Sequence, residues 1–412
     1  MVTRAADKPD QLSGPLQTEM KVLYVAPSYP PSIGGAQVHL HTLAKAVCGL
    51  GPTARVISLW SRNRTDWLMG STLLSEPAAR YDYEGIHVSR LGFSLSTKAA
   101  MLPWVLSYYI LLEPAVKRIS GHMISYLADA AGEPSLVHAT RIGREFLVRA
   151  AIDFAHERGI PFVLTPVHHA KWRGYRYREY DKIYREADAV FALTSVEKEI
   201  LVRDKGVAEH RVHVTGIGPV LSQDYSVEAF RERFGLTQRF VLFLGQQRIY
   251  KGIGAILRAA PIVWRQHPDV RFVFAGPLVH ETAGLFREIS DNRIINLGEV
   301  DLETKTAALA ACEFLCMPST QESFGGVYVE GWSLRKAVIG GRIRQIASVI
   351  SDGTDGLLTE QNPDQLAEAV SWLLAHPDRC QAMGNAGWQK VQDRYSWGRL
   401  ARMTLDVYQA LV

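Results

Sequence analysis

The chain alternates short apolar segments with segments of helical periodicity, and this alternation runs through the sequence twice. The first apolar segment, Lys21–Ala26, ends at Pro27, and a loop rich in Pro and Gly leads from it to a helical stretch at Ala36–Cys48. Short apolar runs are typical of strands buried on both faces, and strands that alternate with helices favour a parallel sheet covered by helices. The further strands that we expect in this series are Arg55–Leu59, Ile86–Arg90, Leu136–His138, Pro161–Thr165, Ala189–Leu193 and Arg211–Val214, with helices at Arg144–Arg158 and Ser195–Lys205.

The alternation restarts beyond Gly216–Ser226, a segment with Gly, Pro and Ser but no periodicity, which we interpret as a hinge. The repetition predicts two α/β units of about 200 residues, each a doubly wound sheet. Sheets of this kind bind ligands beyond the carboxyl ends of their strands, so we expect the functional site in a cleft between the two units. The expected strands of the second series are Phe240–Leu244, Val270–Ala275, Ile294–Leu297, Glu313–Met317 and Ala337–Gly340, and its expected helices are Gly254–Gln266, Leu302–Ala311, Val327–Leu334, Pro363–Ala375 and Arg379–Arg394.

These patterns divide the chain into four parts. Residues 1–19 are polar and lack the apolar core of a signal peptide, and we interpret them as a disordered or cloning-derived leader. The first unit covers residues 20–218 and the second covers residues 219–394. The last part, residues 395–412, is an amphipathic helix whose apolar side chains recur every three or four residues, at Trp397, Leu400, Met403, Val407 and Leu411.

Composition and charge exclude some classes of protein. The formal net charge of +4 is too small to indicate a nucleic-acid partner, but it suits an anionic substrate or loose contact with an anionic membrane. The longest apolar run, Ala99–Val116, is broken by Pro103, Glu113 and Pro114, so we expect no membrane span. The cysteines form no CxxC pair, which favours reduced thiols in a reducing compartment. We therefore expect a cytoplasmic protein, with peripheral contact at the inner face of the membrane left open; its cysteines are Cys48, Cys312, Cys316 and Cys380.

The segment Glu322-Ser-Phe-Gly-Gly-Val-Tyr-Val-Glu330 carries the strongest functional signal. It lies between an expected strand that ends at Met317 and an expected helix that begins near Val327. Glycines let the backbone approach a ligand closely, and the N–H groups at a helix start favour anions. Glu322 would face the cleft, and Glu330, one turn into the helix, would accept hydrogen bonds from two hydroxyls. This combination favours a sugar-nucleotide site over a capping acid beside a solvated one.

Two further glycine-containing loops follow expected strands. The loop Gly245–Gly252 places Arg248 and Lys251 where they would neutralise a leaving diphosphate, although two solvated loop cations would have the same pattern. The pair Gly34-Gly35 precedes the first helix and would bring N–H groups to donor phosphates or to an acceptor. The first strand is not followed by G-x-G-x-x-G, which argues against a dinucleotide-dependent oxidoreductase.

With these motifs the chain resembles family 4 of the retaining glycosyltransferases, whose GT-B fold has two facing Rossmann-like domains and an interdomain cleft. The family's signature is a pair of glutamates separated by seven residues around E-x-F-G, and Glu322 and Glu330 match it. The resemblance implies that Glu322 contacts the transferred sugar, that Glu330 binds the nucleotide ribose and that Lys251 binds the phosphates. It also implies that residues 395–412 cross back to the first domain. Backbone groups implied in donor binding belong to Gly35, Gly245, Phe324, Gly325, Gly326 and Val327.

Three departures from the family pattern affect the donor site. Gln246 stands where the family has an arginine, so Arg248 would have to reach the phosphates in its place. Arg335-Lys-Ala-Val338 replaces a Gly-Lys-Pro-Val stretch, and Gly331-Trp332 replaces two small residues. These changes leave the identity of the nucleotide base open.

The resemblance also implies a histidine at a strand end of the first domain, touching the donor sugar or stabilising developing positive charge. Thr165-Pro-Val-His168-His169 supplies two candidates, and we prefer His169 over His168 as the catalytic residue. Histidines also end strands for structural reasons, and we assign His138 to that class.

Two aromatic segments of the first unit have open interpretations. Lys171–Tyr180 interleaves basic and aromatic residues, and either contacts an acceptor or forms an amphipathic helix with its rings packed inward. For the apolar helix around Met101–Leu112 we expect buried packing rather than membrane contact.

The predicted function is transfer of a hexose-type sugar from a UDP- or GDP-sugar to a hydroxyl group, with retention, in glycan, glycolipid or polysaccharide biosynthesis. No Asp-x-Asp follows a strand, so we expect no metal and no cofactor beyond the nucleotide sugar as co-substrate. The acceptor is a glycan, a lipid-linked sugar or a small molecule. Two alternatives remain on the same fold: a sugar-nucleotide isomerase, which needs acid and base carboxylates in the cleft, and a catalytically silent nucleotide-sugar-binding protein.

Overall fold

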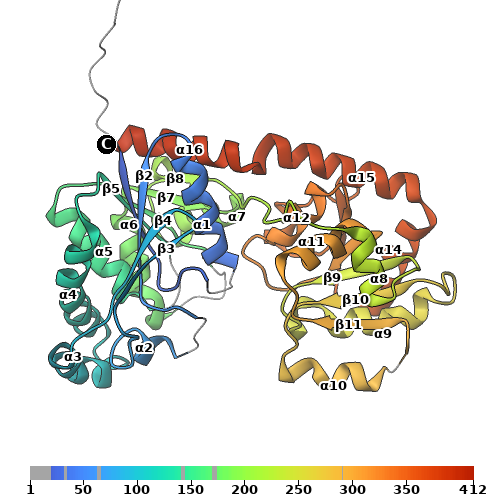
Figure 1. Ribbon diagram of the computed structural model, residues 1–412, viewed down its shortest axis with the longest axis horizontal. Coiled ribbons are helices and arrows are strands. Elements are labelled where there is room, and N and C mark those ends of the chain that lie inside the picture. The colour runs from blue at the N-terminus through green and yellow to red at the C-terminus, as the bar shows by residue number, and fades with distance from the viewer. Residues whose placement is uncertain (1–19, 32–34, 63–65, 141–143, 169–173, 290) are drawn as a thin grey trace, which may run out of the picture.

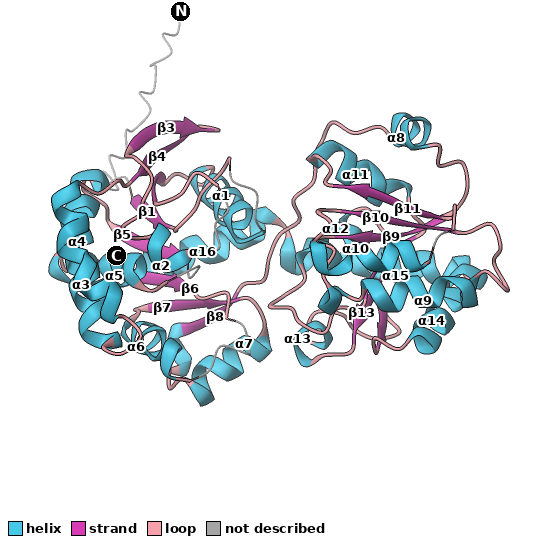
Figure 2. Ribbon diagram, turned by 90° about the horizontal axis from the view of Figure 1, so that it is seen from below, coloured by secondary structure: helices cyan, strands magenta, loops and turns pink. Residues whose placement is uncertain are grey.

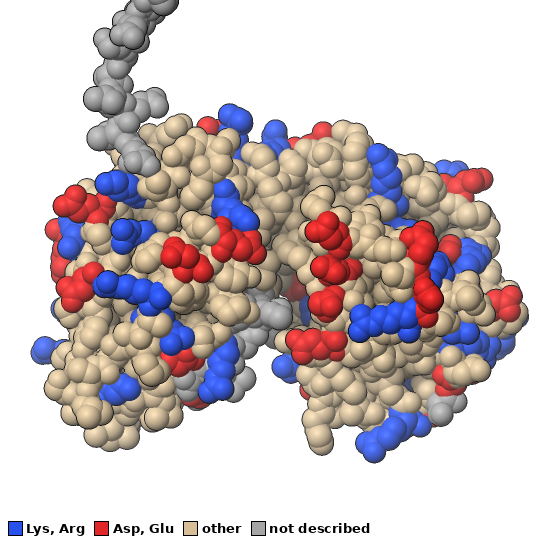
Figure 3. Space-filling view, viewed as in Figure 1, with Lys and Arg blue, Asp and Glu red and all other residues tan. Residues whose placement is uncertain are grey.

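The computed structural model describes residues 20–31, 35–62, 66–140, 144–168, 174–289 and 291–412, so the predicted leader lies outside the described residues. Two α/β halves lie side by side, and the last helices run along the top of both (Figure 1). Seen from below, each half has its own sheet with helices on both faces (Figure 2). In the space-filling view a notch separates the halves along the lower edge (Figure 3).

The N-terminal half is built on an eight-stranded sheet in the order β3-β4-β2-β1-β5-β6-β7-β8. The sheet is parallel except at one edge, where β3 runs antiparallel to β4. The expected parallel sheet therefore carries one antiparallel strand at this edge, which the sequence did not predict. Glu84 and Gly85 have φ values of 46° and 83°, and two consecutive positive φ values form the tight turn that joins adjacent antiparallel strands. The strands are β1 (Lys21–Val25), β2 (Thr53–Ser58), β3 (Ala79–Tyr83), β4 (Ile86–Arg90), β5 (Leu136–Thr140), β6 (Phe162–Thr165), β7 (Ala189–Ala192) and β8 (Val212–Val214).

Helices cover both faces of this sheet (Figure 2). Their inward sides carry the apolar residues that the periodicity indicated, and residues of α5 such as Phe146 and Phe154 are fully buried. The helices are α1 (Gly35–Cys48), α2 (Trp67–Gly70), α3 (Leu95–Ser107), α4 (Leu112–Ala131), α5 (Phe146–Glu157), α6 (Arg178–Glu186) and α7 (Ser195–Glu199), the last continued by a π-helical turn at Ile200–Asp204.

The C-terminal half contains a six-stranded sheet in the order β11-β10-β9-β12-β13-β14, and all its strand pairs are parallel. Its central strands β9 (Phe240–Leu244) and β12 (Phe314–Met317) are buried along their whole length, as continuous apolar runs predict. The other strands are β10 (Arg271–Ala275), β11 (Ile294–Gly298), β13 (Ala337–Gly341) and β14 (Gly356–Thr359). The helices are α8 (Val227–Phe234), α9 (Ile253–Val263), α10 (His280–Glu288), α11 (Leu302–Ala311), α12 (Gly326–Ser333), α13 (Arg344–Ala347), α14 (Pro363–Ala375), α15 (Pro377–Lys390) and α16 (Trp397–Leu411).

Side-chain caps set several helix starts of this half. The Asp301 carboxylate accepts a hydrogen bond from the Thr304 N–H at the start of α11. The Asn362 side chain does the same for two N–H groups of α14, and Pro363 occupies the first helical position. Both arrangements satisfy backbone donors that a helix start leaves unpaired, so these helices begin where the local sequence directs.

The final helix packs on the N-terminal half. Leu400, Ala401 and Tyr408 of α16 belong to the same buried cluster as β1 and α1. The Tyr408 hydroxyl and His138 Nδ1 are hydrogen-bonded, and His138 Nε2 lies 2.8 Å from Thr165 Oγ1. Burial lowers the pKa of His138 to about 3, so its ring is neutral at physiological pH. His138 therefore has the structural surroundings that we expected for it.

The linker between the halves is packed against the start of α16. The indole N–H of Trp397 donates to the carbonyl of Pro219 at 2.7 Å, and the indole ring leaves no room beside Gly218. A Cβ on Gly218 would lie 2.5 Å from the Trp397 ring, and one on Gly216 would lie 2.6 Å from Tyr395. The segment that we interpreted as a hinge is thus in tight contact with the helix that joins the halves.

We expect Gly218→Ala to lower the midpoint of thermal unfolding, followed by circular dichroism. The added methyl group overpacks against Trp397, a change that typically costs about 1–3 kcal/mol. Gly398→Ala is the matched control, because no atom lies within 4 Å of its added Cβ and alanine favours a helix. Equal melting of the two variants would contradict the packing argument.

Candidate active site

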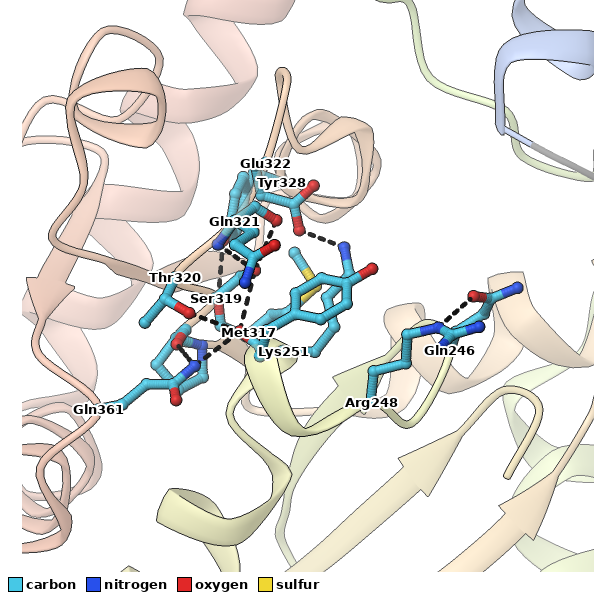
Figure 4. A network of polar contacts seen from close by, with 12 residues as sticks. Gln246, Arg248, Lys251, Met317, Ser319, Thr320, Gln321, Glu322, Tyr328 and Gln361 are labelled. Atoms are coloured by element: carbon cyan, nitrogen blue, oxygen red, sulfur yellow. Dashed lines mark hydrogen bonds and ion pairs between the residues drawn. The ribbon is translucent and has the colours of Figure 1, made fainter. Parts of the chain in front are cut away.

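The carboxyl ends of β9 and β12, which pair with each other, bring two predicted motifs together. Lys251 follows β9 and Glu322 follows β12, and their side chains form an ion pair. Figure 4 shows the two side chains pointing toward one another. The side chains of Lys251 and Glu322 are only 16% and 11% exposed, so solvent screens this pair weakly.

The backbone carbonyl of Tyr250 ties the two loops together. It accepts hydrogen bonds from the Thr320 N–H at 2.8 Å and from Gln361 Nε2 at 2.7 Å (Figure 4). Gln361 Nε2 also donates to the Pro318 carbonyl at 2.8 Å. Gly252 has a φ of 96°, and a Cβ there would lie 2.6 Å from the Pro318 ring. The position of Lys251 is therefore determined by a close backbone contact between neighbouring loops.

The turn after Glu322 presents backbone rather than side chains. The Phe324 ring is buried and packs edge-on against Tyr395, with ring centroids 5.4 Å apart. Gly325 has a φ of 87°, and a Cβ there would lie 2.4 Å from the Tyr328 ring. The Tyr328 hydroxyl donates to the Met317 carbonyl at 2.7 Å, which locks that ring in place. Because α12 begins at Gly326, Gly326 and Val327 supply the first N–H groups of the helix.

Glu330 lies on α12 and pairs with a lysine that the sequence did not single out. Lys305 Nζ of α11 lies 2.8 Å from Glu330 Oε1 and donates to the Val220 carbonyl at 2.7 Å. Burial raises the pKa of Glu330, whereas Lys305 and a backbone hydrogen bond from Val220 oppose that shift. Lys305 and Glu330 are twenty-five positions apart, so no local motif indicates the pair.

Glycines line the strand ends beside this site. Gly245 follows β9 with a φ of 140°, and a Cβ on Gly276 would lie 2.1 Å from the Gly245 carbonyl oxygen. Gln247 is fully buried between these loops, and its Nε2 donates to the Gly276 carbonyl at 2.8 Å and to Asn296 at 2.7 Å. These contacts fix the backbone of Gly245 at the carboxyl end of β9. Because Gly245 has no side chain, that strand end is left open.

Arg248 lies apart from the Lys251–Glu322 pair. Its guanidinium bonds to the Gln246 side chain at 3.2 Å and lies 3.9 Å from Glu281, and its side chain is 42% exposed. Figure 4 shows Arg248 directed toward Gln246 and away from Lys251. In this conformation it does not substitute for the arginine that the family has at the Gln246 position.

The N-terminal half contributes less of the predicted site. His168 is buried, and its Nδ1 lies 3.3 Å from the Tyr184 hydroxyl, so its ring is held within this half. Its backbone N–H donates to Glu197, and the preceding residue, Val167, has a φ of 47°. A positive φ is strained for a β-branched residue, which marks a sharply constrained turn after β6. His169 lies outside the described residues.

The glycine loop and the aromatic segment are only partly described. Gly35 is exposed at the start of α1, and Gly34 lies outside the described residues. The structure describes the segment Lys171–Tyr180 only from Gly174 onward. Within this part, Tyr175 is exposed and Tyr180 is buried. Tyr180 lies in α6, as the amphipathic-helix interpretation predicts.

Among the described residues, no three His, Cys, Asp or Glu side chains are arranged to hold a metal ion. The four cysteines are free thiols, and Cys312 and Cys316 are buried. In the part of the chain that the structure describes, no helix has the length and apolarity needed to cross a bilayer.

Two doubly wound domains with acidic and basic groups at the strand ends of one of them are the features expected of a GT-B fold. The family profile "Glycosyl transferases group 1" matches residues 238–376, and the profile "Glycosyl transferase 4-like domain" matches residues 34–218. Together the two profiles span most of the chain. The protein therefore belongs to the group 1 glycosyltransferases of family 4, and it is an enzyme that uses a nucleotide sugar.

Relatives of the chain are bacterial glycosyltransferases. Alpha-maltose-1-phosphate synthase of Mycolicibacterium smegmatis is 29% identical over 54% of this chain and 63% of its own length. Glycogen synthase of Mycobacterium tuberculosis is 25% identical over 95% of both chains. Both relatives agree with the family that the two profiles show.

Solved structures share the fold over nearly the whole chain. Sucrose-phosphate synthase from Thermosynechococcus elongatus has a TM-score of 0.71 at 18% identity, covering 95% of this chain and 99% of its own. Anabaena HepE in complex with UDP and glucose has a TM-score of 0.69 at 16% identity, covering 95% of this chain and all of its own. The expected GT-B architecture is confirmed.

We expect Lys305→Met to shift the pH dependence of nucleotide binding. Burial raises the pKa of Glu330 and Lys305 lowers it, so loss of Lys305 raises that pKa further. A protonated Glu330 accepts hydrogen bonds poorly, so nucleotide affinity should begin to fall at a higher pH than in the wild type. Titration calorimetry from about pH 8 down to about pH 5 measures the shift.

Two variants control this experiment. Glu330→Gln carries no titrating carboxyl group and should flatten the acid limb. Lys336→Met removes a lysine that lies just beyond the C-terminal end of α12 and donates to the Cys312 carbonyl, and this variant should titrate as the wild type does. An unshifted profile in Lys305→Met would show that Lys305 does not control Glu330.

Proposed function

We propose that the protein transfers a hexose-type sugar from a UDP- or GDP-sugar to an acceptor hydroxyl with retention of configuration and without a metal ion. The observation that carries this proposal is the Lys251–Glu322 pair at the junction of β9 and β12. A diphosphate that enters the site competes with Glu322 for Lys251. The exchange would free the Glu322 carboxylate to accept a hydrogen bond from a sugar hydroxyl.

The same residues fit the charge changes of the reaction. As the bond from the anomeric carbon to phosphate breaks, negative charge grows on the diphosphate, and Lys251 stabilises it. The acceptor oxygen forms its bond to the anomeric carbon on the face that the phosphate leaves. The acceptor proton passes to an oxygen of the departing phosphate, so neither glutamate needs to act as a nucleophile.

The remaining donor contacts follow from the geometry around α12. Glu330 would bind the ribose hydroxyls, and the N–H groups of Gly326 and Val327 would bind phosphate or sugar oxygens. Gly35 and Gly245 would admit the donor close to the backbone. Closure of the two halves would then expel water and bring the acceptor side of the N-terminal half, including His169, to the sugar.

Arg248 supplies a second cation in this proposal. Lys251 and Lys305 are each paired with a glutamate, so the site of these four side chains has no net charge before the donor binds. A nucleoside diphosphate adds negative charge that this balance does not neutralise. Among the described residues, Arg248 has a long contact to Glu281 and a neutral partner in Gln246, so its movement toward the diphosphate breaks little.

Glycan, lipid-linked and small-molecule acceptors all fit a hydroxyl nucleophile, and we propose no single acceptor from the site alone. Anabaena HepE binds UDP and glucose, and the curated relatives include a glycogen synthase, which favours a hexose donor. An isomerase would need acid and base carboxylates that reach the sugar in the cleft. The two glutamates of the site are instead paired with lysines.

We expect one nucleotide series to raise the melting temperature in a thermal-shift screen of UDP-, GDP-, ADP- and TDP-sugars. A ligand that binds only the native state stabilises it by RT ln(1 + L/Kd), where L is the free ligand concentration. EDTA should leave the shift unchanged, and Glu330→Ala should abolish it. A shift that requires Mg²⁺, or no shift with any donor, would count against the proposed donor site.

We expect Lys251→Ala to lower kcat by about 10²- to 10³-fold, the usual cost of losing one group that stabilises developing charge. Lys251→Arg keeps the charge and should retain much of the activity. In Lys251→Ala, turnover should fall more for a donor with a poorer leaving group than for an activated donor. Unchanged turnover in Lys251→Ala would disprove the role in leaving-group stabilisation.

The variant Arg248→Ala distinguishes the contribution of Arg248 to turnover from that of Lys251. If Arg248 moves to the diphosphate, this variant should also lose activity, and its loss should be smaller than that of Lys251→Ala. Wild-type turnover in Arg248→Ala would leave Lys251 as the sole cation at the leaving group.

A further inference from the structure

The helix α3 and the turn that follows it are apolar on two sides. One side packs inward, where Met101, Val105 and Tyr108 are buried. The other side faces solvent, where Leu106 is 75% exposed and Ile110 is 78% exposed. The expectation that the helix around Met101–Leu112 is simply buried was therefore wrong for half of its apolar residues.

We call the exposed apolar residues of this region the α3 corner. They recur at helical spacing along α3 and continue through the turn before α4, which places them on one side of the helix. The turn is held by hydrogen bonds from the N–H groups of Ile110 and Leu111 to the Ser107 carbonyl, at 2.9 and 2.8 Å. The α3 corner comprises Leu95, Leu102, Leu106, Tyr109, Ile110 and Leu111.

Cations surround the α3 corner. Lys117 and Arg118 are exposed on the first turns of α4, and the Arg118 guanidinium lies 5.8 Å from the Trp104 ring of α3. Arg144 donates to the Tyr109 hydroxyl at 3.0 Å. The nearest acid on α4, Glu113, is paired with Lys182 at 2.9 Å. In Figure 3 the region of α3 is largely tan with Lys and Arg side chains around it.

Exposed apolar side chains next to cations are unfavourable in water but are suited to the interface of a lipid bilayer. Exposed leucine and isoleucine side chains at consecutive turns lose the free energy of burial. The helix that carries them, α3, lies at the end of the N-terminal half that faces away from the C-terminal half (Figure 1). Apolar side chains flanked by lysine and arginine are the pattern by which a helix lies in the interface of an anionic bilayer. We propose that the α3 corner docks the protein on a membrane surface that contains anionic lipids.

The docking surface is connected to the acceptor side of the enzyme. The Tyr175 hydroxyl donates to the Ile110 carbonyl at 3.4 Å, and Tyr175 lies in the segment between β6 and α6, beyond His168. The α3 corner and the notch between the halves also lie on the same lower side of the molecule (Figure 3). Given the proposed transfer reaction, a membrane on this side favours the lipid-linked acceptor among the three classes.

Vesicle flotation tests the docking surface without donor or acceptor. The wild type should float with vesicles of phosphatidylcholine containing about a third phosphatidylglycerol, and more weakly with phosphatidylcholine alone. Leu106→Glu with Ile110→Glu should lower the bound fraction about tenfold or more, because two apolar anchors become charged. Lys117→Gln with Arg118→Gln should weaken binding to the anionic vesicles and reduce its dependence on salt.

Leu302→Glu with Val412→Glu is the matched control, since it adds the same charge at two exposed apolar residues away from the α3 corner. This control should float as the wild type does. Failure of the wild type to bind anionic vesicles, or equal binding by both glutamate pairs, would overturn the proposal. A concentration-dependent dimer that Leu106→Glu with Ile110→Glu abolishes, without vesicle binding, would assign the α3 corner to a second copy of the chain instead.

The donor thermal shift, measured on the same variants, separates this proposal from the proposed function. The α3 corner is remote from Lys251 and Glu330, so its glutamate variant should keep the wild-type shift. Lost flotation with an intact donor shift would support docking alone. If the wild type floated with vesicles but no donor raised its melting temperature, the membrane-docking proposal would be supported and the transferase proposal would be contradicted.

Discussion

The ion pair between Lys251 and Glu322 is the interaction on which the arrangement of the site depends. Two charged groups that are mostly buried cost desolvation energy, and only good geometry and further hydrogen bonds offset that cost. Here the offset comes from the backbone. The Tyr250 carbonyl joins the two loops, and Gly252 allows them to approach more closely than a side chain would permit. The sheet therefore holds a cation and a carboxylate at one position before any donor arrives.

The linker between the halves contributes to the same site. Val220 receives a hydrogen bond from Lys305 and gives one to Glu330, so the linker backbone is part of the predicted ribose site. On the other side, Gly216 packs against Tyr395, whose ring contacts Phe324. Both ends of the segment from Glu322 to Glu330 are thus in contact with the linker or with the start of α16. Because these contacts involve the linker and Tyr395, we expect a change in the angle between the halves to alter the segment from Glu322 to Glu330, the proposed donor loop.

Much of the fold could be predicted from local pattern. The strand Phe240–Leu244 and the helices Leu302–Ala311 and Pro363–Ala375 have the bounds that apolar runs and cap residues indicate. The strand β3 could not be predicted, because its sequence Ala-Arg-Tyr-Asp-Tyr alternates between polar and apolar and is only half buried at the sheet edge. The apolar helix around Met101–Leu112 was also predicted, but its sequence could not show that only part of its apolar surface is covered.

The site was predictable to the extent that its residues share a loop or a strand end. Glu322, Lys251 and Glu330 each follow a strand or open a helix, and loop-to-loop contact between adjacent strands follows from the parallel sheet. Lys305 was missed because its partner comes from another helix, and helix-to-helix pairs leave no trace in a local pattern. The direction of the His168 ring was likewise not predictable, since it depends on Tyr184 in the next helix.

Under the proposed function, the Lys251–Glu322 pair and Arg248 together let a site without a strong net charge bind a diphosphate. In the donor-free state Lys251 neutralises Glu322, and Lys305 neutralises Glu330. A sugar hydroxyl can donate a hydrogen bond to the Glu322 carboxylate without carrying a charge, so Lys251 becomes available to phosphate as Glu322 turns to the donor. Binding then exchanges one set of charged contacts for another of similar strength instead of desolvating isolated cations. Under this proposal, specificity comes from a ligand that offers a sugar hydroxyl to Glu322, a diphosphate to Lys251 and ribose hydroxyls to Glu330 at the same time.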